Sequence, residues 1–111
     1  MKITFDDYQK LSFMIIAYLK EMERSGQDNV QQHSIVEEVI KREVTQSNVT
    51  MEKTIELKKQ IQNVIQHLIT KESILMVTQD AKTKDERYLA LNINVDLANL
   101  PQLAGNGDAV Y

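Results

Sequence analysis

The sequence predicts a mainly helical α+β domain of the winged helix-turn-helix class, in which three helices are closed by a β-hairpin wing. Residues 51–71 carry a long amphipathic helix pattern. Two short apolar runs, 74–79 and 87–92, follow it and are separated by the charged loop 80–86. A helix that leads into two such runs is typical of a helix feeding a hairpin. Two further helical patterns precede this part of the chain and complete the three-helix plan.

Length and composition allow one domain and exclude several function classes. The chain has 111 residues, of which 42% are hydrophobic, so it can bury a single core. It has no cysteine, which excludes disulfides and thiolate metal sites. No apolar run approaches the roughly 20 residues of a membrane span, so we expect no membrane partner. The net charge of −3 disfavours a strong autonomous DNA binder, because such modules are usually basic.

The first helix is expected at residues 5–24. Thr4 can cap it, and two aspartates in its first turn suit the positive end of the helix dipole. Phe13 and Ile16 either belong to a helix packed on two sides or form a second docking surface. Gly26 is expected to end the helix. The buried stripe, which recurs at spacings of three and four, contains Tyr8, Leu11, Ile15, Tyr18 and Met22.

The second helix is expected at residues 35–44, after a very short strand at 30–32. Ser34 and Glu37 have the spacing of a capping box, which would start this helix. The polar segment 45–49 is expected to be the loop that leads to the third helix. The side chains that the second helix would bury are Val36, Val39 and Ile40.

The third helix has a narrow apolar stripe formed by Leu57, Ile61, Val64, Ile65 and Leu68. Ile55 lies roughly 120° from this stripe, by the advance of 100° per residue. Its neighbours on the outer face are Glu52, Lys59, Gln62 and Gln66. Ile55 is therefore either one of the scattered apolar residues that are normal on a protein surface, or the centre of a small docking site.

The alternation in the hairpin predicts that Ile74, Met76, Leu89 and Leu91 face the core. The hairpin loop carries three charges of each sign, counting Arg87 at its end, and we expect a solvated tip. The domain would span residues 4–97, followed by a flexible tail at 98–111. The predicted core contains Leu11, Ile15, Val36, Ile40, Ile61, Val64, Ile65, Leu68, Met76 and Leu89.

The sequence offers no recognisable catalytic or cofactor site. Its three glycines, Gly26, Gly105 and Gly107, cannot form a phosphate-binding loop. His33 and His67 are far apart in sequence and lack a partner at ligand spacing, and we expect His67 to be solvated. We therefore expect a chain without an enzymatic function, cofactor or metal, whose function lies on its surface.

Six segments of the chain resemble, in order, those of a known domain. They are residues 7–12, 15–20, 34–36, 64–68, 74–77 and 87–92, which read DYQKLS, IIAYLK, SIV, VIQHL, ILMV and RYLALN. The ordered set resembles the C-terminal winged-helix domain of subunit six of the eukaryotic minichromosome maintenance replicative helicase. The resemblance covers about residues 5–97.

The resemblance implies a role in helicase loading. The parent subunit would belong to a nuclear heterohexameric ATP-driven helicase, with its ATPase core upstream of this chain. The domain would dock the Cdt-type licensing factor, which brings the hexamer to the origin recognition complex. The contacting segment of that factor is basic in the family, so an acidic, partly apolar patch would suit it. The family contact maps onto residues 43–55, and the implied protein-binding residues are Glu43, Met51, Glu52, Ile55 and Glu56.

The chain departs from the family pattern in two places. The loop 45–50 contains no acidic residue, whereas the family tends to be more acidic there. Glu43, Glu52 and Glu56 would therefore have to supply the negative charge. After the last strand, residues 92–95 read NINV, where relatives often carry a proline.

Two other functions stay open from the sequence. In the first, the domain binds duplex DNA weakly through the third helix and the wing, with Lys53, Lys59, Lys82 and Lys84 as candidate contacts. The overall negative charge opposes this binding. In the second, the chain is a stand-alone transcriptional regulator that dimerises through its first helix, but the resemblance counts against it.

Overall fold

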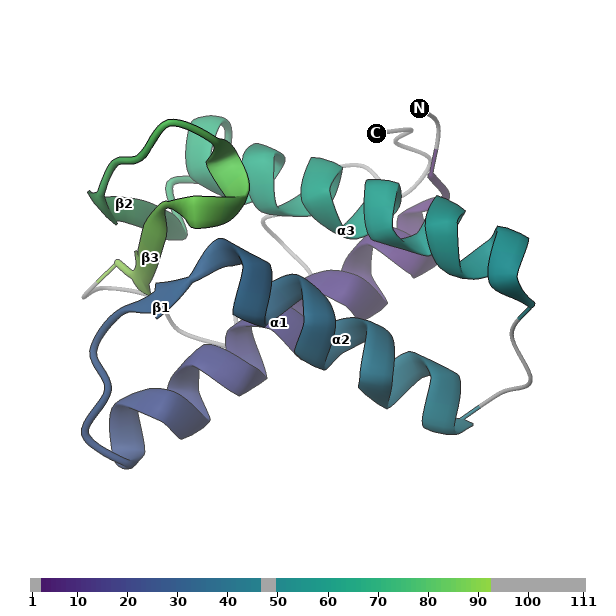
Figure 1. Cartoon of the computed structure of the whole chain (residues 1–111), viewed down its shortest axis with the longest axis horizontal. Helices are drawn as coiled ribbons and strands as arrows, with labels where there is room; N and C mark the ends of the chain where they lie inside the picture. Colours follow the sequence, from purple (N-terminus) through teal and green to yellow (C-terminus); the bar gives the residue numbers. More distant parts are fainter. Residues whose placement is uncertain (1–2, 47–49, 93–111) are drawn as a thin grey trace.

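The computed structural model describes residues 3–46 and 50–92, and it has the predicted class (Figure 1). Three helices and a small three-stranded antiparallel sheet form a mainly helical winged-helix domain. The predicted tail at 98–111 lies outside the described residues. The elements in chain order are α1 (Phe5–Arg24), β1 (Val30–Gln31), α2 (Gln32–Gln46), α3 (Met51–Thr70), β2 (Leu75–Gln79), the short 3-10 helix η1 (Lys84–Glu86) and β3 (Tyr88–Leu91).

Helix α1 has the predicted bounds because both of its ends are capped. The Thr4 hydroxyl accepts a backbone N–H of the first turn at 3.1 Å. At the other end Gly26 adopts a φ of 96°, which glycine tolerates without a steric penalty. Its N–H donates to the Glu23 carbonyl, and the Gln27 N–H donates to the Met22 carbonyl. This pair of bonds is a Schellman motif, which satisfies carbonyls that the helix leaves unpaired.

Helix α1 packs on two sides, as the first of the two interpretations predicts, and the alternative of a second docking surface is excluded for Ile16, which is fully buried. Phe13 is partly exposed and borders a shallow hollow between α1 and α2. The other residues that line this hollow are Met14, Ala17, Lys41, Arg42 and Thr45.

Helix α2 begins earlier than predicted, at Gln32. The prediction that Ser34 starts this helix with a capping box is therefore wrong. The strand β1 leads directly into the helix, and the Gln32 N–H donates to the Arg87 carbonyl at 2.9 Å. Strand pairing therefore satisfies the first N–H, so no serine cap is needed. The Glu37 carboxylate instead lies 3.0 Å from the His33 imidazole, one turn away.

The sheet lies at one end of the helices, in the order β1-β3-β2 (Figure 1). In β3, Leu89 pairs with Val30 of β1 on one side and with Val77 of β2 on the other. Leu75 pairs with Leu91 at the far end of the hairpin. The central strand thus joins both neighbours and carries the fully buried Leu89 into the core.

The predicted core position of Met76 is wrong, since this side chain is 45% exposed. Ser73 adopts a left-handed φ of 54° after α3, and the Ile74 N–H donates to the Leu68 carbonyl. Ile74 is therefore buried in the turn before the strand begins. The strand alternation starts at Leu75, which takes the core face and leaves Met76 on the solvent face.

The core joins all three helices and the sheet. The predicted stripe of α3 is confirmed, because Ile61, Val64, Ile65 and Leu68 are buried and Leu57 packs against them. Ile40 of α2 is partly buried at the edge of this core. The other buried apolar residues of the described chain are Ile3, Tyr8, Leu11, Ile15, Ile16, Leu19, Val30, Ile35, Val36, Val39, Ile74, Leu75, Leu89 and Leu91.

Candidate functional site

Four of the five residues predicted to bind a protein lie in the first two turns of α3. Thr50 caps this helix by accepting a backbone N–H at 3.2 Å, so the helix starts at Met51. Met51 is 78% exposed and Ile55 is 54% exposed, and both Glu52 and Glu56 are exposed. Met51 and Ile55 are one turn apart, so their side chains are neighbours on one face of the helix.

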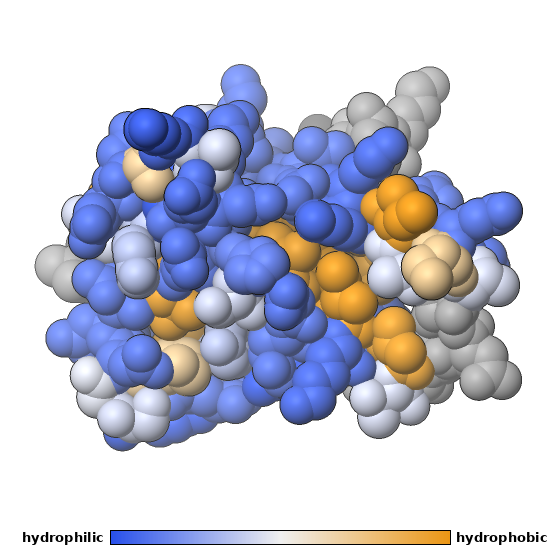
Figure 2. All heavy atoms as spheres, viewed as in Figure 1, coloured by the Kyte–Doolittle hydropathy of each residue, from blue (hydrophilic) through white to orange (hydrophobic). Residues whose placement is uncertain are grey.

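Val44, in the last turn of α2, adds a third exposed apolar side chain, at 41%. Only residues 47–50 separate the end of α2 from the start of α3, so the two helix ends can be at most roughly 18 Å apart. Figure 2 shows apolar side chains gathered over these adjoining ends. We refer to Val44, Met51, Glu52 and Ile55 as the docking face. Sequence reasoning assigned no role to Val44, although an apolar residue just before a polar turn was an available signal.

Glu43 lies away from the docking face. Its side chain is only 12% exposed and accepts a bond from the Lys10 ammonium at 2.6 Å. It borders a hollow that Gln60 also lines, and Gln60 is roughly 140° round α3 from Ile55. Lys53 and Glu56 line the same hollow. A lysine of α1 therefore already offsets the Glu43 charge, and its role in binding stays a prediction.

The four lysines predicted as nucleic-acid contacts are all exposed. The structure does not gather them on one face, because Lys53 and Lys59 point roughly 120° apart on α3. Lys82 and Lys84 lie in the loop between β2 and β3. Of the four, Lys84 borders a polar cleft between α3 and this loop.

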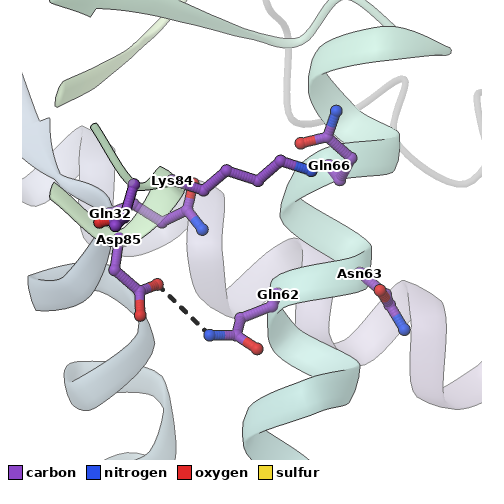
Figure 3. Close-up of a pocket in the computed structure, with 7 residues that line it drawn as sticks. Gln32, Gln62, Asn63, Gln66, Lys84 and Asp85 are labelled. Atoms are coloured by element: carbon purple, nitrogen blue, oxygen red, sulfur yellow. Dashed lines mark hydrogen bonds between the residues drawn. The ribbon is translucent and has the colours of Figure 1, made fainter. Parts of the chain in front are cut away.

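The polar cleft has a volume of about 420 Å³ (Figure 3). The Gln62 amide crosses it and donates to the Asp85 carboxylate at 3.3 Å. Figure 3 also shows the Lys84 side chain extending toward Gln66. No apolar side chain lines the cleft within the described part of the chain. The lining residues are Gln32, Gln62, Asn63, Gln66, Thr83, Lys84 and Asp85.

Arg87 holds two of the residues that line the polar cleft, which corrects the prediction that its charge is solvated. It is only 8% exposed, and its guanidinium donates at 2.9 Å to the amide oxygens of both Gln32 and Gln66. Burial lowers the pKa of Arg87, while the charges of Asp80 and Asp85 act in the opposite direction. Among the residues described, no carboxylate forms an ion pair with it.

Comparison with known families agrees with this architecture. A family model described as the MCM6 C-terminal winged-helix domain matches residues 1–97. The chain belongs to this family. Comparisons with curated proteins and with solved structures gave no match. As an MCM6 winged-helix domain, it is a non-catalytic domain of a helicase subunit that works with the other subunits of the MCM complex.

The prediction that His67 is solvated is wrong, because this side chain of the MCM6 domain is partly buried. Its Nδ1 lies 2.8 Å from the Tyr8 hydroxyl, and the two rings meet edge to face with centroids 5.1 Å apart. The contact joins α3 to the start of α1. Burial lowers the pKa of His67, and the nearby Lys71 ammonium lowers it further.

Neither a metal site nor a membrane span is found in the MCM6 domain as far as its structure is described. No group of three or more His, Asp or Glu side chains there could hold a metal ion. Within the same residues, every helix is too short or too polar to cross a membrane.

Proposed function

We propose that the docking face binds the basic segment of a Cdt-type licensing factor during helicase loading at replication origins in the nucleus. The observation that carries this proposal is the grouping of exposed apolar side chains. Five large hydrophobic residues are exposed in the described part of the chain, and Val44, Met51 and Ile55 are three of them. Scattered surface hydrophobics are normal, but a group at the junction of two helices is typical of an interaction site.

The chemistry of the docking face suits a partner with apolar anchors and positive charge. Ile55 and Met51 can insert into a partner because neither is packed against the core. Met51 adapts its shape through three rotatable bonds, which favours irregular contacts. Glu52 and Glu56 lie beside them on α3, where they would attract a basic segment and speed its association. The licensing factor would then carry the complex to the origin recognition complex.

The proposal is tested by calorimetric titration of the chain with the basic segment of the licensing factor. Ile55→Ala should weaken binding by about 2 kcal/mol or more, as expected for an interface hot spot. Its free energy of unfolding should change by less than about 0.5 kcal/mol, since Ile55 lies outside the core.

Met76→Ala is the matched control. Met76 is also an exposed apolar residue, at 45%, but it lies on β2 and not on the docking face. Its replacement should leave affinity for the segment unchanged. Equal losses in the two variants, or no loss for Ile55→Ala in a folded domain, would show that the docking face is not the binding site.

A further inference from the structure

The shallow hollow between α1 and α2 is a second surface where apolar and charged side chains meet. It has a volume of about 460 Å³, which lies within the range of ligand pockets, about 300–1,000 Å³. Phe13 and Met76 are the exposed large hydrophobic residues of the described chain that lie outside the docking face, and Phe13 borders this hollow. The lining residues are Phe13, Met14 and Ala17 from α1 and Lys41, Arg42 and Thr45 from α2.

The packing of α1 against α2 fixes the shape of the hollow. Met14 lines it and also packs against the core. Arg42 of α2 joins the helices, because its guanidinium donates to the Glu21 carboxylate of α1 at 3.0 and 3.3 Å. The same guanidinium donates to Glu38 of its own helix at 2.8 Å and lies 5.4 Å from the centre of the Tyr18 ring. A partner therefore meets a hollow that is already formed, which lowers the entropy cost of binding.

Two lysines beside the hollow make no ion pair with any described residue. Lys41 lines the hollow, and Lys20 lies one turn beyond Ala17 on the same face of α1. In the described part of the chain no acidic side chain lines the hollow, and the two glutamates that bind Arg42 are already engaged. Glu37 is exposed one turn before Lys41 and weakens the positive potential. The lysines still favour a partner that carries carboxylates.

The apolar half of the hollow distinguishes an acidic peptide from a nucleic acid. The side chains of Phe13, Met14 and Ala17 have no hydrogen-bond donor for a phosphate, but they can contact a large apolar side chain. A basic segment, such as the one proposed for the docking face, would be repelled by Lys20 and Lys41. A peptide with apolar anchors between carboxylates satisfies both halves of the hollow.

We propose that the hollow between α1 and α2 binds an acidic peptide segment of a second protein, distinct from the partner of the docking face. A large apolar side chain of this segment enters the hollow against Phe13 and Ala17, and neighbouring carboxylates pair with Lys41 and Lys20. The contact does not depend on the docking face, because Ile55 and its neighbours on α3 take no part in it. The two surfaces therefore select protein segments of opposite charge.

Titration of the nitrogen-15-labelled chain with two synthetic peptides tests the proposal. Both peptides carry the same leucines along one helix face, flanked by glutamates in the first peptide and by lysines in the second. The glutamate peptide should shift the backbone amide signals of Phe13, Ala17 and Lys41, and its affinity should fall as salt is added. The lysine peptide should leave these signals in place. The proposal is wrong if the glutamate peptide does not shift them, or if both peptides shift them equally.

Lys41→Glu is the decisive variant, because Lys41 is exposed and its replacement leaves the core intact. It should weaken binding of the glutamate peptide roughly 3- to 10-fold, since an exposed attraction becomes a repulsion. Lys82→Glu, which makes the same charge change in the loop between β2 and β3, is the matched control and should have little effect. Phe13→Ala should weaken binding by about 10-fold or more, whereas Ile55→Ala should leave it unchanged. Equal effects of the two lysine variants, or a loss of binding in Ile55→Ala, would overturn the proposal.

Discussion

The two ends of α3 differ in what they present to solvent. Its first two turns expose Met51 and Ile55 beside Glu52 and Glu56. The rest of the helix, from residue 57 onward, exposes lysines and amides and borders the polar cleft. Apolar groups with acidic neighbours suit a basic protein segment, whereas amides and lysines suit phosphate. The two ends of α3 therefore offer different chemistry to a partner.

The net charge of the chain does not reveal this difference between the two ends of α3. Net charge describes the whole chain, at −3, but binding depends on the local distribution of charge. Glu52 and Glu56 lie at the start of α3, whereas residues 57–71 contain three lysines and no acidic residue.

The largest expected effect comes from the core that holds both ends of α3 in place. Ile61→Ala or Leu68→Ala should lower the free energy of unfolding by about 2–5 kcal/mol, because both side chains are fully buried. Denaturant unfolding measures this loss. A loss below about 0.5 kcal/mol at both positions would mean that the stripe does not form the core, since that is the range for surface sites.

Arg87→Met should destabilise the cleft end of the domain. It removes the donor to the buried Gln32 amide oxygen and one donor to Gln66, which costs about 1–3 kcal/mol when such groups are left unpaired. Lys84→Met, at an exposed position in the same loop, is the control and should change stability by less than about 0.5 kcal/mol. Similar stabilities for the two variants in denaturant unfolding would contradict the supporting role of Arg87.

Val44→Ala tests whether the docking face extends from α3 to the end of α2. If Val44 contacts the partner at the edge of the interface, affinity for the licensing-factor segment should fall by about 1 kcal/mol, less than for Ile55→Ala. Calorimetric titration gives this value, and Met76→Ala serves again as the control. Unchanged affinity would restrict the docking face to α3.

Glu52→Lys should mainly slow association of the basic segment, as measured by stopped-flow kinetics. The side chain is exposed, so the effect on affinity should be about 0.2–1 kcal/mol and should shrink as salt is added. Dissociation should change little. A salt-independent effect would indicate a direct contact and not long-range steering.

The smallest effect concerns pH. Burial lowers the pKa of His67 in the folded state, so the unfolded state takes up the proton more readily. The contribution is fully present above the ordinary pKa of about 6.5 and is lost as pH falls through the lower folded value. Unfolding measured between neutral and mildly acidic pH should show this loss in the parent chain and not in His67→Gln. If the free energy of unfolding depends on pH equally in both chains, His67 is not the group responsible.

The helices could be predicted from sequence because their signals are local. Thr4, Gly26 and the apolar periodicity gave the bounds of α1, and Ile55 was placed outside the core of α3. The errors arose where an unforeseen turn or a contact between residues distant in sequence decides the position of a side chain. Met76 is exposed because the turn at Ser73 shifts the start of the strand alternation to Leu75. The alternation of apolar residues in the sequence does not reveal this turn.

The polar cleft was missed for a similar reason. A charged residue at the end of a polar loop is usually solvated, so Arg87 gave no sign of burial. Its partners Gln32 and Gln66 lie 55 and 21 residues away in sequence. Only the pairing of β1 with β3 brings the start of α2 next to this arginine.

The most direct test of the docking face is amide shift mapping on the nitrogen-15-labelled chain. The basic segment of the licensing factor is added in steps. The account predicts that the backbone signals of Val44, Met51 and Ile55 shift, while that of Met76, which is exposed on β2, does not. Shifts centred on another surface, or no shifts at all, would contradict it.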